Sequence, residues 1–136
     1  MRFSVEQRAV GCLRGVAVGD AMGKMTEGYR PKEITEAYGG PITGFAKPIQ
    51  PRSRFKWKYA EVTDDTRFTL LIARSILSKR KVDSEDIMKR IRRRPIKGWP
   101  RWHGFCKAMQ GGQKERVNFA AMADTNGAPM KMSPIG

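Results

Sequence analysis

The sequence contains 136 residues, with 27 Lys and Arg against 13 Asp and Glu, and its formal net charge is +14. That length fits one domain able to bury a core without disulfides or metals, and no apolar run approaches the roughly 18 residues of a membrane span. The charge favours partners such as nucleic acids, phosphate-rich ligands or anionic surfaces.

The two cysteines, Cys12 and Cys106, stand apart from any Cys-x-x-Cys pair or histidine cluster. This spacing argues against a zinc site and against a disulfide framework. The first residues, Met1–Ser4, lack the apolar core and cleavage site of a signal peptide. We therefore expect a soluble, cytoplasmic protein in which both thiols are reduced.

The first predicted helix runs from Val5 to about Met22. Ser4 and Gln7 form a capping-box pattern at its start. Glycine recurs at every fourth residue along one side of this helix, at Gly11, Gly15 and Gly19. Because glycine inside a helix is destabilising, three in register predict a stripe against which another helix packs closely.

Residues 24–59 are rich in glycine and proline, which leaves room for only one short helix, at Pro31–Tyr38. The segment from Lys47 to Tyr59 mixes basic and aromatic residues. Such a segment can bind single-stranded nucleic acid by stacking and charge. It can equally be a solvated loop whose aromatic side chains fill the core.

A second long helix is predicted from Asp64 to about Ser78. Its apolar stripe is widened by Leu70, Ala73 and Leu77, which predicts burial on most sides. Thr63 with Asp64 can simply begin this helix, the hydroxyl as a cap and the carboxylate against the helix dipole. The same oxygens, together with Asp65, can instead hold a hard divalent cation.

A third helix is predicted to begin at Asp83 or Ser84 and to end before Pro95, with acidic residues first and basic residues last. Residues 96–112 are expected to be loop-like, with a short helical stretch at Phe105–Met109, and the lone His103 is expected to be structural. No segment alternates as a strand would, so the fold class predicted is all-α.

Three motifs stand in order along the chain. They are Gly19-Asp20-Ala21-Met22-Gly23 followed by Glu27, then Thr63-Asp64-Asp65-Thr66, then Asn126-Gly127-Ala128-Pro129-Met130-Lys131. This ordered set resembles the N-terminal half of the ADP-ribosylglycohydrolase (ADP-ribosylhydrolase) family. The resemblance covers Gly11–Gly136 and implies an orthogonal multi-helix fold, with residues 1–136 forming a single, partial domain.

The resemblance also implies a function: hydrolysis of the glycosidic bond between ADP-ribose and a modified side chain or small acceptor, with Mg²⁺ or Mn²⁺ at the site. It assigns metal ligation to Thr63, Asp64 and Asp65, and catalysis to Glu27 and Asp65. Asp20 is equally open to a structural or a catalytic role. It assigns substrate contacts to the glycine-containing loop of Asn126, Gly127 and Ala128 and to the neighbouring Met130.

The sequence also departs from the family pattern. Pro129 and Lys131 replace a small residue and an arginine, Lys24 is unusual after the Gly23 turn, and the downstream Asp-x-Asp-Thr motif that completes the metal site is absent. Half of the domain would leave apolar helix faces open to a second copy or a complementing chain. A catalytically inactive relative that binds ADP-ribose or a nucleotide, and a basic nucleic-acid-binding domain, remain alternative interpretations.

Overall fold

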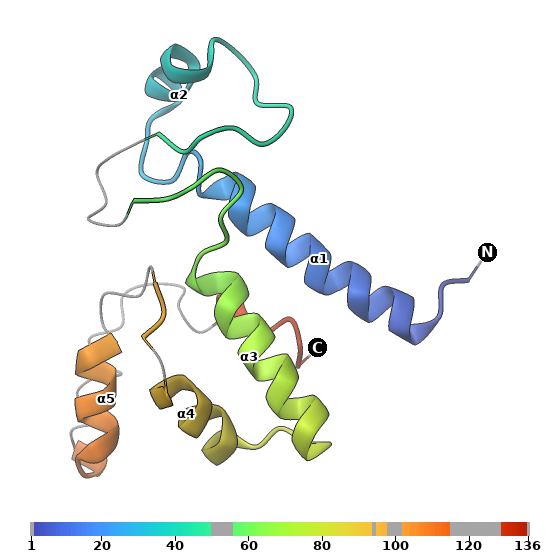
Figure 1. The fold of residues 1–136 in the computed structure, drawn as a ribbon, viewed down its shortest axis with the longest axis vertical. Helices are drawn as coiled ribbons and strands as arrows, with labels where there is room; N and C mark the ends of the chain where they lie inside the picture. The colour runs from blue at the N-terminus through green and yellow to red at the C-terminus, as the bar shows by residue number, and fades with distance from the viewer. Residues whose placement is uncertain (1, 50–55, 94, 98–101, 115–128, 136) are drawn as a thin grey trace. The chain divides into compact units, whose positions relative to one another are not determined.

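The computed structural model describes residues 2–49, 56–93, 95–97, 102–114 and 129–135. These residues form α-helices and one short 3₁₀ turn and contain no strand, which confirms the all-α prediction (Figure 1). The elements are α1 (Val5–Gly23), α2 (Pro31–Tyr38), α3 (Asp64–Lys79), α4 (Ser84–Arg93), α5 (Trp102–Gln110) and η1 (Pro129–Lys131). None of these described helices combines the length and apolarity needed to cross a bilayer.

The chain divides into two compact units, Met1–Thr66 and Arg67–Gly136. The first contains α1, α2 and the first turn of α3, and the second contains the remaining elements. That the whole chain is one partial domain stays a prediction.

The start of α1 is built as the sequence predicts. The Ser4 hydroxyl oxygen accepts the Gln7 amide proton at 3.1 Å, and the Gln7 side chain accepts the Ser4 amide proton at 2.9 Å. These reciprocal bonds satisfy amides that a helix start otherwise leaves without partners. The helix ends at Gly23, one residue beyond the predicted end.

The glycine stripe of α1 does not receive a second helix from any described residue. A Cβ added at Gly11, Gly15 or Gly19 would meet no heavy atom within 4 Å. Val10 and Val18 on the same helix are 46% and 47% exposed, whereas Ala21 in the last turn is buried. Within the first unit only the C-terminal end of α1 is covered, and the close packing predicted for the glycine stripe stays a prediction.

The core of the first unit forms around Met25, which is 1% exposed. The Tyr38 hydroxyl at the end of α2 lies 3.0 Å from the Met25 carbonyl oxygen and 2.8 Å from that of Lys47. The Ala46 amide donates to the Met25 sulfur at 3.0 Å. Burial raises the pKa of Tyr38 above its ordinary value. These contacts tie α2 and the following loop to the turn that leaves α1.

The basic and aromatic loop splits between core and surface. Trp57 is buried, and the Lys24 ammonium lies 4.8 Å from the centre of its ring. Tyr59 is exposed and meets the edge of Phe45. The interpretation that aromatic side chains fill the core is confirmed for Trp57, which is therefore not available to stack on a base.

The second unit is organised on one face of α3, where Phe68, Ile72 and Ser75 are buried. The Lys131 ammonium of η1 lies 4.2 Å from the centre of the Phe68 ring. The predicted burial on most sides of α3 is wrong, because Leu77 is 67% exposed and Leu70 also lies at the surface.

Helix α4 has the predicted order of charge, with acidic residues in its first turn and basic residues in its last. The Asp83 carboxylate accepts the Asp86 amide proton at 3.0 Å at the start of α4, as the sequence predicts. Helix α5 covers Trp102–Gln110 and is longer than the predicted Phe105–Met109. Cys106 lies within this helix, and both cysteines are free.

Candidate metal centre

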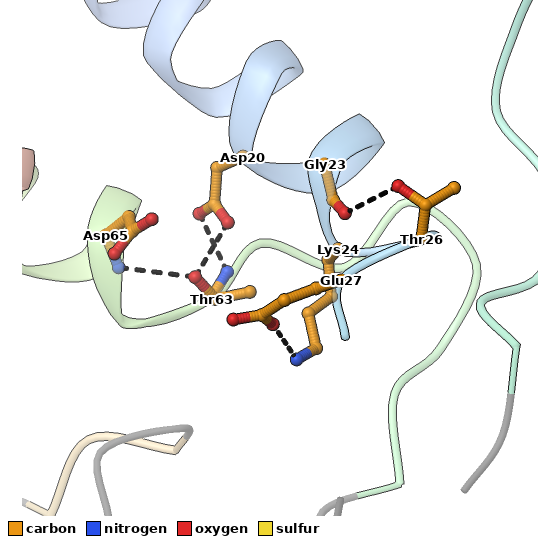
Figure 2. Close-up of polar contacts among 7 residues, drawn as sticks. All are labelled: Asp20, Gly23, Lys24, Thr26, Glu27, Thr63 and Asp65. Atoms are coloured by element: carbon orange, nitrogen blue, oxygen red, sulfur yellow. Dashed lines mark hydrogen bonds and ion pairs between the residues drawn. The ribbon is translucent and has the colours of Figure 1, made fainter. Parts of the chain in front are cut away.

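The site is built where the last turn of α1 meets the first turn of α3, within the first unit (Figure 2). The Asp20 carboxylate accepts the amide proton of Thr63 at 2.8 Å and its hydroxyl proton at 2.7 Å. It also accepts the amide proton of Thr66 at 3.1 Å and its hydroxyl proton at 2.5 Å. The first and second motifs of the sequence are thereby joined.

This arrangement follows from the needs of a helix start. The first amides of α3 have no partner within the helix. The Thr63 hydroxyl oxygen accepts the Asp65 amide proton at 3.3 Å, and Asp20 accepts that of Thr66. Asp64 and Asp65 occupy the first turn, where a negative charge complements the helix dipole. The capping interpretation of this motif is therefore confirmed.

Capping uses only part of the hydrogen-bonding capacity of the Thr63 hydroxyl. A hydroxyl has one proton and two lone pairs. The proton of Thr63 goes to Asp20, and one lone pair accepts the Asp65 amide proton. The other lone pair takes no part in these two bonds, and the two residues that follow Thr63 in the chain, Asp64 and Asp65, are half-buried.

The donor set fits a hard divalent cation in kind, because hydroxyl and carboxylate oxygens are the ligands that Mg²⁺ and Mn²⁺ take. It supplies only part of a coordination shell of about six oxygens. Across the part of the chain that the structure describes, no three or more His, Cys, Asp or Glu side chains gather closely enough to hold a metal alone.

Glu27 lies in the turn that follows α1, and its side chain is 67% exposed. Its carboxylate pairs with the Lys24 ammonium (Figure 2). The Lys24 side chain is only 13% exposed, and its ammonium lies over the Trp57 ring. The residue that departs from the family pattern is thus the partner of the predicted catalytic acid. This ion pair was not predicted from the sequence, although opposite charges three positions apart near a helix end can indicate one.

The third motif is only partly described. Met130 is half-buried in η1, next to Lys131. Asn126, Gly127 and Ala128 lie outside the described residues, so their predicted contacts with substrate stay predictions. On α4, Arg92 and Arg93 are exposed, as expected for a solvated helix end.

Comparison with known proteins identifies the family. The family model for ADP-ribosylglycohydrolase matches residues 1–136. The chain is 34% identical to the ADP-ribosyl-[dinitrogen reductase] glycohydrolase of Rhodospirillum rubrum over 84 residues, which are 62% of this chain and 27% of that protein.

Two uncharacterized proteins match almost the whole chain. One, from Archaeoglobus fulgidus, is 30% identical over 97% of this chain and 43% of its own length. The other, YegU of Escherichia coli, is 32% identical over 96% of this chain and 41% of its own length. The chain thus spans less than half the length of these curated relatives. By the family match over its full length, the chain belongs to the ADP-ribosylglycohydrolase family.

Proposed function

We propose that the chain carries part of the active site of a metal-dependent hydrolase. The bond cleaved would join ADP-ribose to a modified side chain or a small acceptor. The observation that supports this most is the state of the Thr63 hydroxyl, which donates its proton to Asp20 and accepts the Asp65 amide proton, so that one of its lone pairs takes no part in the cap. Family membership supports the reaction class.

Thr63, Asp64 and Asp65 would hold Mg²⁺ or Mn²⁺, which when bound would fix the ribose hydroxyls and polarise a water molecule. The rest of the metal shell would come from water, substrate, a second copy or a complementing chain. Asn126, Gly127, Ala128 and Met130 would contact the diphosphate region, where glycine lets the backbone come close.

Glu27 would act as the general base, and Asp65 would lie beside the reacting centre. Glu27 would accept a proton from the water whose oxygen bonds to the anomeric carbon. The acceptor would leave with the electron pair of the broken glycosidic bond and take up a proton, which Glu27 or solvent can return. Its exposed carboxylate is within reach of solvent and is held by Lys24. Lys24 would thereby orient the base without touching the substrate.

The test is release of ADP-ribose from an ADP-ribosylated protein or small conjugate, with Mg²⁺ or Mn²⁺ and with a chelator. Release should require the metal and should fall at least about a hundredfold in the double variant Asp64→Asn, Asp65→Asn, since two charged ligands are lost. The matched control is Glu85→Gln, which removes an exposed acid from the first turn of α4. Release that persists in the double variant would contradict the ligand assignment.

A catalytically inactive ADP-ribose-binding relative is the second candidate. Calorimetry with ADP-ribose, with and without Mn²⁺, separates the two candidates. Binding without release under any metal condition would decide for the second, and neither binding nor release would contradict both.

A further inference from the structure

The two oxygen atoms of the Asp20 carboxylate accept different protons. Its Oδ1 atom accepts the Thr63 hydroxyl proton, and its Oδ2 atom accepts the other three protons. Thr63 and Thr66 are buried and Asp20 is half-buried, so water competes poorly for these bonds. Neither hydroxyl is therefore free to turn its proton elsewhere.

A carboxylate imposes a direction on these bonds, because its ionised form only accepts protons. If another residue stood at position 20, the Thr63 hydroxyl could rotate and place its proton where a cation would sit. Hydrogen bonds that orient a ligand in this way commonly change metal affinity by about 10- to 100-fold.

We propose that Asp20 is a positioning residue for the divalent cation: it fixes the Thr63 hydroxyl proton so that a lone pair of that oxygen is left for the metal. The inference rests on the proposed function, since it requires Thr63 to be a ligand. It assigns to Asp20 a role in metal affinity that goes beyond joining α1 to α3.

A purely structural role is the alternative that the experiment has to separate. Asp20 also accepts the third amide proton of α3, as a capping residue would, so its loss will lower stability in either case. The decisive quantity is therefore Mn²⁺ affinity compared at an equal loss of thermal stability.

The experiment measures the Mn²⁺ dissociation constant of the chain by calorimetry and its unfolding temperature by circular dichroism. Asp20→Asn keeps the size of the side chain but presents N–H donors toward the hydroxyls. It should weaken Mn²⁺ binding about tenfold or more. The control Ile72→Ala removes a buried side chain further along α3. It should lower the unfolding temperature but change the dissociation constant less than about twofold.

Asp20→Glu separates direction from charge and serves if Asp20→Asn does not fold. It keeps the negative charge but moves the oxygens by one methylene group. Positioning predicts weaker binding in this variant too, by about threefold or more, whereas a charge effect alone predicts no change.

Each outcome decides a separate question. A parent chain that binds no Mn²⁺ would overturn the proposed ligand set, and this inference with it. A parent that binds Mn²⁺ while both Asp20 variants bind equally well would overturn the inference alone. Equal weakening in Ile72→Ala would do the same, because the effect would then follow stability.

Discussion

Thr63 is the residue on which two interpretations of the same motif meet. The sequence presents capping and metal ligation as alternatives, and the structure shows a cap that leaves one lone pair of the Thr63 hydroxyl unused. The reason is elementary, since one hydroxyl has a proton for Asp20 and separate lone pairs for an amide and a cation. A capping role at a helix start therefore does not count against a ligand role.

Asp86 gives a prediction about pH. Its pKa lies below the ordinary 3.8, first because the Arg90 side chain donates a hydrogen bond to it and second because the Ser75 hydroxyl does so. A lowered pKa means that the ionised form is favoured in the folded state. Its contribution to stability is therefore full above the unfolded-state value and is lost as pH falls through the folded-state value.

We expect Asp86→Asn to unfold at a lower temperature than the parent at pH 7, and the difference to shrink as pH falls from 5 to about 2. Thermal unfolding followed by circular dichroism across this range would measure it. The neighbouring Glu85→Gln, on an exposed residue of the same turn, should leave the profile close to that of the parent. A difference that stays constant with pH would contradict the assignment.

The helices differ in how well the sequence predicts them, and the difference follows from what determines each boundary. Helices α1 and α2 begin at a capping box and at Pro31, signals that lie within a few residues of the boundary. Helix α5 lacks such a signal, and its length was underestimated. Which faces are buried depends on distant partners, so the expected burial of Leu77 was wrong, and the close packing predicted for the glycine stripe stays a prediction.

The open glycine face of α1 gives a prediction at this scale. Gly15→Ala should stabilise the chain by about 0.5–1 kcal/mol, because alanine loses less backbone entropy in a helix and its Cβ has open space. Urea unfolding would measure the change in the free energy of unfolding.

Gly39→Ala is the matched control, and we expect it to lower the free energy of unfolding. Gly39 follows α2 with φ of 74°, a conformation that costs an alanine roughly 1–2 kcal/mol. A loss of stability in Gly15→Ala would mean that this face of α1 is covered by something that leaves no room for a methyl group.

For the molecule as a whole, the order of three motifs predicted the family, and the family model over residues 1–136 confirms it. The geometry of the site could not be predicted in the same way. The partners of Asp20 lie 43 and 46 positions further along the chain, and nothing local to position 20 indicates them. Motif order indicates which residues belong to one site, whereas only the fold shows which of their atoms are hydrogen-bonded to one another.

The net charge gives the prediction for the whole chain. With a formal charge of +14, like charges repel one another in the folded state. Raising NaCl from about 10 to about 200 mM shortens the screening length from roughly 30 to under 10 Å and should raise the unfolding temperature by several degrees. An uncharged osmolality control such as glycerol, matched in osmotic strength, separates screening from solute effects. An unfolding temperature that does not respond to salt would show that the charges are too dispersed to matter.

The bonds between Asp20 and Thr63 close a loop over 43 positions of the chain. The entropy lost on closing such a loop grows only with the logarithm of its length, so ten inserted residues would cost about 0.2 kcal/mol. Segments between these two anchors can therefore lengthen or shorten among relatives at little thermodynamic cost. The residues of that segment can therefore diverge while the bonded oxygens of Asp20 and Thr63 keep their positions.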